Sequence, residues 1–170
     1  VIESLSGVTK KATKNTNGYY RGPRDDNYIK FNNILFRIVK VNSDGTVTIV
    51  SENPLANIDY GAKNGKFDGS NMDEWLNDYF YASLNNKSKK LIVDTKWCND
   101  SVTTSNIAKT NCDKFTASKK IAILSLEDYN NSIGERGESY LQIRARTWYN
   151  NFDSNNKIWS VKSNTLEAYK

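Results

Sequence analysis

The chain has 170 residues, a formal net charge of +5 and a mean hydropathy of -0.69. A chain of this length folds by default as one compact domain, and its 4 Trp, 10 Tyr and 6 Phe supply the apolar bulk that disordered segments lack. The basic residues are interspersed with acidic ones, which argues against a nucleic-acid-binding protein. With 0 His, the commonest general base and metal ligand is missing, and no apolar run approaches the ~20 residues that span a bilayer.

Residues 1–17 are small and polar, with lysines at positions 10, 11 and 14. We expect a leader or connecting segment here, which either pairs along a sheet edge or stays mobile. The chain begins at Val1 without a signal-peptide pattern, so we expect a mature fragment. Residues 18–170 are expected to form a single α+β domain, because no internal repeat or linker interrupts them.

The first part of this domain is patterned as strands. Residues 28–31 alternate between polar and apolar, and a turn is expected at Asn32 and Asn33. Two β-branched runs, 34–41 and 46–50, then flank an Asp-Gly turn, which is the strongest short-range signal for a β-hairpin. An antiparallel meander is therefore predicted.

A helix is predicted to follow a glycine-punctuated loop at residues 61–69. Ser70 is a good N-cap, and Asp73 and Glu74 suit the positive start of the helix. Apolar residues recur at three- and four-residue spacing at Met72, Trp75, Leu76, Tyr79, Phe80 and Leu84. We expect this stripe, including Trp75 and Phe80, to pack on the sheet.

In the second half of the chain, the patterns that predict helices and strands are shorter. We expect a short helix at 88–93, a buried strand at 120–126, and a helical turn that starts at Ser125 with Asp128. A turn is expected at 134–137, residues 141–149 are ambiguous between helix and strand, and residues 157–161 alternate as a strand does. The fold class predicted is α+β, with a mixed, mainly antiparallel sheet and one principal amphipathic helix.

Cys98 and Cys112 are predicted to form a disulfide that closes an Asn/Thr/Ser-rich loop. Such a bond favours an extracellular location, because cytosolic thiols are kept reduced. Two alternatives stay open. One is a metal site completed by Asp100 and Asp113, and the other is a cysteine nucleophile that would lack an imidazole partner.

Several strings in the chain resemble an uncharacterised domain that is repeated in surface proteins of low-G+C Gram-positive bacteria. They cover most of the chain from Gly18 to Tyr169 and occupy residues 18–22, 27–31, 36–47, 74–77, 80–81, 97–100, 123–129, 147–149 and 158–161. The closing pattern is an aromatic strand, a polar loop and a second Trp-bearing strand. It also looks like the end of C-type-lectin-like folds, including the formylglycine-generating-enzyme branch.

The resemblance implies a compact mixed domain whose loops bind protein or carbohydrate, and it supplies no activity. Lectin calcium sites of this fold use Glu-Pro-Asn or Gln-Pro-Asp plus Trp-Asn-Asp. Here the run 52–54 has that order scrambled, and a cysteine interrupts Trp97-Cys98-Asn99-Asp100. These departures argue against calcium-dependent sugar binding. The formylglycine-generating enzymes need cysteines late in the chain, and none follows Cys112.

Paired carboxylates can hydrolyse glycosides without histidine, but the acidic pairs of this chain are sequence neighbours whose side chains diverge. We therefore expect no catalytic residue, no metal and no cofactor. Aromatic and arginine side chains among polar neighbours are the candidate ligand contacts, because partly exposed rings stack on sugars or anchor protein partners. These candidates are Tyr19, Tyr20, Arg146, Trp148 and Tyr149.

The function predicted is a non-enzymatic extracellular recognition or adhesion domain of a bacterial surface protein, attached to the cell surface. It is expected to bind a host or bacterial surface protein or glycan through loops 53–70, 99–111 and 153–157. A membrane would be reached only through an anchor outside this chain. The alternative is a structural subunit of a surface filament or pilus that self-associates through residues 1–17 by strand addition.

Overall fold

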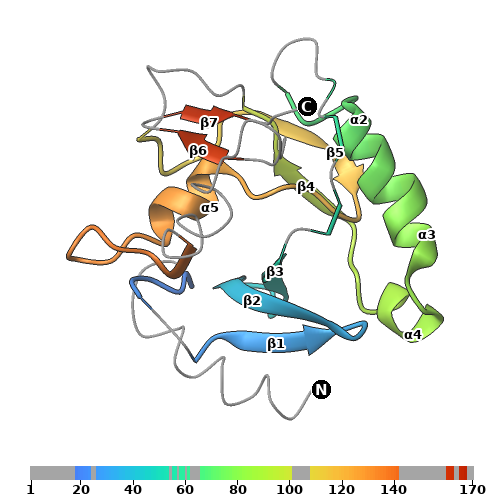
Figure 1. Ribbon diagram of the computed structural model, residues 1–170, viewed down its shortest axis with the longest axis horizontal. Coiled ribbons are helices and arrows are strands. Elements are labelled where there is room, and N and C mark those ends of the chain that lie inside the picture. Colours follow the sequence, from blue (N-terminus) through green and yellow to red (C-terminus); the bar gives the residue numbers. More distant parts are fainter. Residues whose placement is uncertain are drawn as a thin grey trace.

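The computed structural model describes residues 18–23, 26–53, 55–56, 58–59, 61, 66–100, 108–141, 160–162 and 165–167. These residues form an α+β fold with antiparallel strand pairing and one disulfide. In Figure 1 a three-stranded sheet lies below a two-stranded hairpin, with one helical run to the right and a short helix to the left. The predicted leader at 1–17 lies outside the described residues.

The three-stranded sheet is the meander predicted from the sequence. Its strands are β1 (Tyr28–Phe31), β2 (Ile34–Val41) and β3 (Val47–Ser51), in the order β1-β2-β3. Asn32 and Asn33 form the first turn with positive φ angles of 48° and 62°, a conformation that asparagine tolerates. Gly45 closes the second turn by donating its N–H to the carbonyl of Asn42 at 3.0 Å.

A register shift between Ile38 and Lys40 marks a bulge in β2. As a result Ile38 and Val39, which are sequence neighbours, are both fully buried. Residues 18–20 extend the sheet beside this bulge, since Val41 donates to Gly18 and Tyr20 donates to Val39, each at 2.9 Å. The sheet thus gains a short additional segment that the sequence did not reveal.

The core joins this sheet to residues far along the chain. Gly22 donates its N–H to the carbonyl of Ser132 at 2.9 Å and accepts the N–H of Tyr140 at 2.8 Å. Tyr140 and Leu141 then pack with Tyr20, Ile38 and Val41 in one buried cluster. The main apolar core therefore lies between the three-stranded sheet and the segment that follows α5.

The predicted amphipathic helix is a continuous run of α2 (Asn71–Glu74), the π-helical turn η1 (Trp75–Phe80) and α3 (Tyr81–Ser83). Ser70 is its N-cap as predicted, because its hydroxyl accepts the N–H of Asp73 at 3.1 Å. Leu76 is buried in the packed face, whereas Trp75 and Phe80 are half-buried and stack on each other at 5.5 Å. The expectation of two core rings is therefore met only in part.

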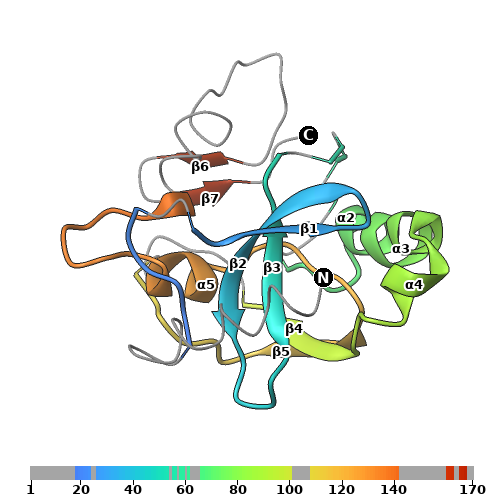
Figure 2. The ribbon, with the colours of Figure 1, turned by 90° about the horizontal axis from the view of Figure 1, so that it is seen from below.

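A short helix α4 (Asn86–Lys89) follows, earlier than the predicted 88–93, and leads to β4 (Thr95–Cys98). This strand pairs antiparallel with β5 (Phe115–Lys119), a hairpin that the sequence analysis did not predict. The other described pair is β6 (Ser160–Lys162) with β7 (Thr165–Glu167), and β6 includes the end of the strand predicted at 157–161. Figure 2 shows the same elements from below.

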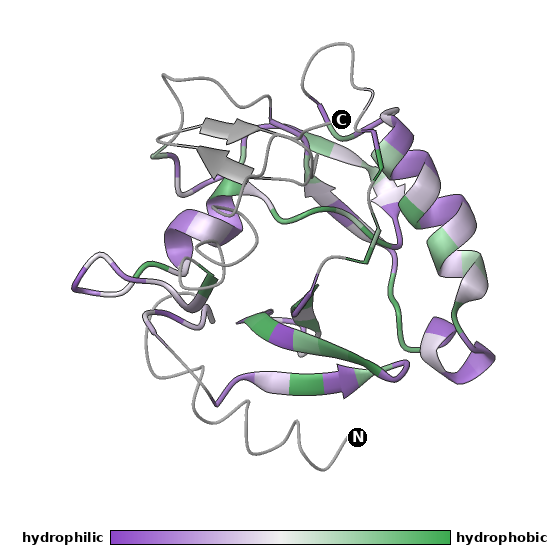
Figure 3. Cartoon of the chain, viewed as in Figure 1, coloured by the Kyte–Doolittle hydropathy of each residue, from purple (hydrophilic) through white to green (hydrophobic). Residues whose placement is uncertain are grey.

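The prediction of a buried strand at 120–126 is wrong. Residues 120–125 form no strand and are only partly buried, and Leu126 opens α5 (Leu126–Asn131). Figure 3 shows the apolar stretch between β5 and α5 that produced the error. The helical turn itself is confirmed, because Ser125 and Asp128 form a reciprocal capping box.

The predicted turn at 134–137 is confirmed by a hydrogen bond from Gly137 N–H to Gly134 O at 3.0 Å. Apart from residue 141, the ambiguous segment 141–149 lies outside the described residues. Among the described helices, none combines the length and apolar content that crossing a bilayer requires.

Candidate binding surface

The predicted disulfide between Cys98 and Cys112 is present, with the two Cα atoms 5.7 Å apart. Cys98 is the last residue of β4, and Cys112 lies three residues before β5. The bond therefore joins the two arms of the polar excursion close to the paired strands. In this oxidised form both sulfurs are consumed by the bond, so the metal and nucleophile alternatives do not apply to it.

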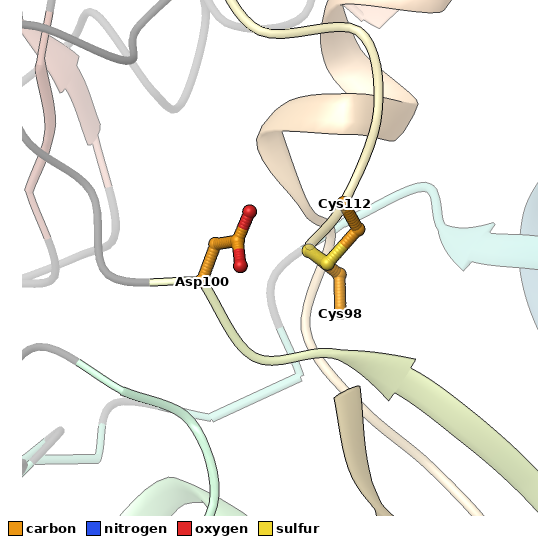
Figure 4. A group of neighbouring side chains, drawn as sticks. All are labelled: Cys98, Asp100 and Cys112. Atoms are coloured by element: carbon orange, nitrogen blue, oxygen red, sulfur yellow. A yellow bond between two sulfur atoms is a disulfide. The ribbon is translucent and has the colours of Figure 1, made fainter. Parts of the chain in front are cut away.

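Asp100 holds the excursion together beside the disulfide (Figure 4). Its carboxylate accepts the backbone N–H of Asp113 at 3.1 Å, the N–H of Lys114 at 2.8 Å and the ammonium of Lys109 at 2.9 Å. Burial acts to raise the pKa of Asp100, but these donors outweigh it and hold that pKa below its ordinary value. A charged Asp100 is thus part of the folded state at neutral pH.

Lys109 bridges two carboxylates, since its Nζ also lies 2.5 Å from Asp113 Oδ2. Its hydrogen bonds to Asp113 and Asp100 raise the pKa of Lys109. The backbone of Lys109 and of the next residue is fixed to α5, because the amide of Asn130 donates to Lys109 O and the amide of Asn131 donates to Thr110 O, each at 2.7 Å. The second arm of the excursion is therefore anchored independently of the disulfide.

Two of the three predicted recognition loops meet at this place. The N–H of Asp68, in loop 53–70, donates to Asn99 Oδ1 of loop 99–111 at 3.0 Å. The third loop, 153–157, lies outside the described residues. We define the disulfide surface by the residues that the hairpin end and these loops bring together: Asp68, Cys98, Asn99, Asp100, Lys109, Cys112, Asp113 and Phe115.

A partly buried ion-pair cluster links the disulfide surface to the start of α2. Lys119 of β5 lies 2.7 Å from Asp73 Oδ2 of α2 and 2.9 Å from Asp68 Oδ1. Burial acts to lower the pKa of Lys119, but the two carboxylates outweigh it and raise that pKa. Asp73 also accepts the N–H of Gly69 at 2.9 Å, so the loop end is held against the helix start.

The sequence analysis expected partly exposed rings at Tyr19 and Tyr20, and this is wrong, because both are buried. The Tyr19 hydroxyl donates to Asp128 at 3.1 Å and to Glu127 at 3.4 Å, and its ring lies under the ammonium of Lys40. These contacts dock α5 on the sheet and leave neither ring as an exposed stacking platform. The other predicted ligand contacts, Arg146, Trp148 and Tyr149, lie outside the described residues.

The cluster around Tyr19 is electrostatically unusual. Burial, and then the charges of Asp128 and Glu127, hold the pKa of Tyr19 far above its ordinary value. Burial and the neighbouring Asp128 also raise the pKa of Glu127, although Lys40 acts in the opposite direction. The cluster packs against the start of α5, where the capping box already fixes Asp128.

Sequence reasoning also missed a buried cation in β2. Arg37 is almost fully buried and donates to Asn27 Oδ1 at 2.7 Å. Its guanidinium lies over the rings of Tyr28 and Tyr140, 3.8 Å and 5.4 Å from their centres, and close to Glu52. The pairing of Tyr28 with Arg37 in the β1–β2 register could have pointed to one of these contacts.

The fold and the disulfide surface define a disulfide-bonded α+β domain. The chain belongs to the family described as Domain of unknown function (DUF6273), whose profile matches residues 44–167. Searches of curated proteins and of solved structures find no match to the chain.

Proposed function

We propose that this chain is a non-enzymatic extracellular recognition domain of a bacterial surface protein, and that the disulfide surface is part of its binding site. The observation that carries the proposal is the Cys98–Cys112 bond, since stable disulfides belong to oxidising compartments. The proposed location is the cell surface of a Gram-positive bacterium. The finer fold proposed is C-type-lectin-like, on the sequence resemblance given above.

The proposed binding mode is surface complementarity between the loops and a protein or glycan partner. The described ends of the excursion are held, by Asp100 on one arm and by α5 on the other, and ordering these ends in advance reduces the entropy that they lose on binding. Beside it, the ring of Phe115 is 55% exposed at the start of β5, and exposed rings suit both partner classes.

The experiment is binding of the purified domain to glycan and matrix-protein arrays, followed by a matched pair of variants. Phe115→Ser removes the exposed ring of the disulfide surface. Leu91→Ser removes an apolar side chain of similar exposure, 57%, between α4 and β4. We expect Phe115→Ser to weaken the selected interaction at least about tenfold and Leu91→Ser to leave it unchanged. Equal loss in both variants would contradict a site at the disulfide surface.

The same arrays test the predicted contacts outside the described residues. Substitution of Arg146, Trp148 or Tyr149 by alanine is expected to weaken binding, because these side chains are proposed ligand contacts. Retention of full affinity in all three variants would remove them from the site. Antibody labelling of intact producing cells tests the proposed location, and labelling only after the cells are lysed would contradict it.

Filament assembly through residues 1–17 stays the alternative. Ordered fibres from the purified protein, lost on deletion of 1–17 while the fold persists, would favour it over recognition.

A further inference from the structure

We propose that reduction of the Cys98–Cys112 disulfide opens a site for one soft divalent cation such as Zn²⁺, formed by the two cysteine thiolates and the carboxylate of Asp100. The two sulfurs and a carboxylate oxygen of Asp100 all lie within 4.8 Å of one another. Figure 4 shows that they come from the two arms of one excursion, with Asp100 beside the bridge. This proposal concerns the reduced protein and goes beyond the recognition function of the oxidised one.

The chemistry of the donor set fits zinc. Zn²⁺ binds thiolates at about 2.3 Å and carboxylate oxygens at about 2.0–2.2 Å, usually with four ligands. Three ligand atoms that already cluster need only small shifts once the sulfurs part, and water would supply the fourth ligand. Two thiolates, one carboxylate and Zn²⁺ sum to a charge of −1, which the neighbouring ammonium of Lys109 would balance.

The ligands are expected to stay together after the bond is broken, because other contacts hold both arms. Cys98 pairs with Phe115 in the hairpin, and Asn99 donates its N–H to Lys114 O at 2.7 Å. Asn131 fixes Thr110, two residues before Cys112. The disulfide is thus one of several links across this excursion.

Asp100 can accept a cation without losing its backbone contacts. Among the described residues, its Oδ1 accepts the N–H of Lys114, and each carboxylate oxygen has about two lone-pair directions. Lys109 can move away from Asp100 and still keep its ion pair with Asp113. The arrangement therefore leaves room for an additional partner on Asp100.

The redox step balances with a phosphine as the reductant. The S–S bond takes up two electrons from the phosphine and two protons from solvent, which gives two thiols, while the phosphine gains the oxygen of a water molecule. Each thiol then releases its proton to solvent as its sulfur binds the cation. The metal itself undergoes no redox change.

The test is a Zn²⁺ titration of the whole chain against a chromophoric chelator, with and without prior reduction by a water-soluble phosphine. We expect one tightly bound Zn²⁺ per reduced chain and none in the oxidised protein. Asp100→Asn is expected to lower the affinity at least about tenfold, whereas the control Asp113→Asn keeps it. Equal binding by the oxidised and reduced proteins, or equal loss in the two variants, would overturn the proposal.

A second measurement tests the proposal if the reduced chain does not stay folded without a metal. If the reduced chain loses its near-ultraviolet circular dichroism, recovery on adding Zn²⁺ supports the site, because metal binding then drives folding. Failure to recover overturns it. X-ray absorption at the zinc edge of the wild-type protein is expected to show two sulfur ligands together with oxygen, and a spectrum with fewer than two sulfurs would contradict the ligand set.

Discussion

Asn77 and Ile121 exchange two hydrogen bonds between the helical run and the segment after β5. The Asn77 amide donates to Ile121 O and accepts the N–H of Ile121, each at 3.0 Å, and its oxygen also accepts the N–H of Lys120 at 3.1 Å. One side chain therefore satisfies the backbone groups that a neighbouring strand would otherwise bind. This explains how residues 120 and 121 are held against the helix although they form no strand.

Asn77→Ala is expected to lower the free energy of unfolding by about 2 kcal/mol, because it leaves partly buried backbone groups without their partner. Asp78→Ala, a change at the exposed neighbouring position, serves as the control and is expected to cost less than about 0.5 kcal/mol. Urea unfolding of both variants makes the comparison. Equal losses would show that the Asn77 bridge is not stabilising.

Gly18 is expected to tolerate no side chain. Its φ is +80°, and a Cβ atom there would collide with the backbone carbonyl oxygen of Val41. Gly45 is the matched control, because its φ is +84° but a Cβ there would meet nothing within 4 Å. Gly45→Ala carries only the left-handed backbone cost of about 1–2 kcal/mol, and Gly18→Ala is expected to lose clearly more.

The comparison of the two glycine variants isolates the clash from the backbone strain, which they share. Thermal unfolding of both variants under the same conditions measures the difference between their stabilities. A Gly18→Ala variant as stable as Gly45→Ala would mean that residues 18–20 do not lie against β2 as the structure has them.

Lys119→Met removes the cation between Asp68 and Asp73 and is expected to cost about 2–3 kcal/mol, since Asp73 is left charged and buried. Adding Asp73→Asn to this variant is expected to restore part of the loss, because the uncompensated charge is then gone. The coupling energy from the double-mutant cycle measures the pair. A coupling energy near zero would contradict the ion pair.

Glu127 is expected to make folding less favourable as the pH rises. Its pKa in the folded state is raised above its ordinary value of 4.5, so the folded chain holds this proton more tightly than the unfolded chain. The resulting stability is complete below 4.5 and is lost as the pH rises through the folded-state pKa. The pKa values of Asp44 and Asp100 are lowered from 3.8 in the folded state, so both carboxylates stabilise the fold above pH 3.8. That stability is lost as the pH falls through their folded-state pKa values.

Glu127→Gln should therefore flatten the dependence of stability on pH above 4.5 and raise stability at neutral pH, while its side-chain oxygen can still accept the Tyr19 hydroxyl. Urea unfolding at a series of pH values measures this. An unchanged slope would show that Glu127 is not the responsible group.

Features set by neighbouring residues were predictable from the sequence. The asparagine turn at 32–33, the Ser70 cap, and the capping box of Ser125 and Asp128 each depend on residues at most a few positions apart. The disulfide was also predicted, because the sequence contains only two cysteines and the loop between them is polar.

Features that depend on distant partners were not predictable. Asn77 meets Ile121 across 44 positions, and the Tyr19 hydroxyl meets Asp128 across 109. Tyr19 was placed among exposed residues because its sequence neighbours are polar, whereas α5 covers it in the fold. The apolar run at 120–126 was misread for the same reason, since periodicity alone does not identify the partner of a short apolar segment.

Loss of the disulfide is expected to lower the free energy of unfolding of the domain without unfolding it. For a sequence separation of 14 the chain-entropy estimate is about 3 kcal/mol, and we expect the contacts of Asp100 and Asn130 to persist when the bond is absent. The Cys98→Ser/Cys112→Ser double variant, unfolded in urea beside the wild type, measures this cost. A variant as stable as the wild type would contradict the structural role of the bond.

The most direct test of the proposed extracellular display is the thiol state of the protein taken from the surface of the producing cells. The protein is denatured in the presence of an alkylating agent, without reductant, and its intact mass is measured. Our account predicts no alkylation before reduction and alkylation of both cysteines after it. Alkylation of both Cys98 and Cys112 in the unreduced sample would contradict it.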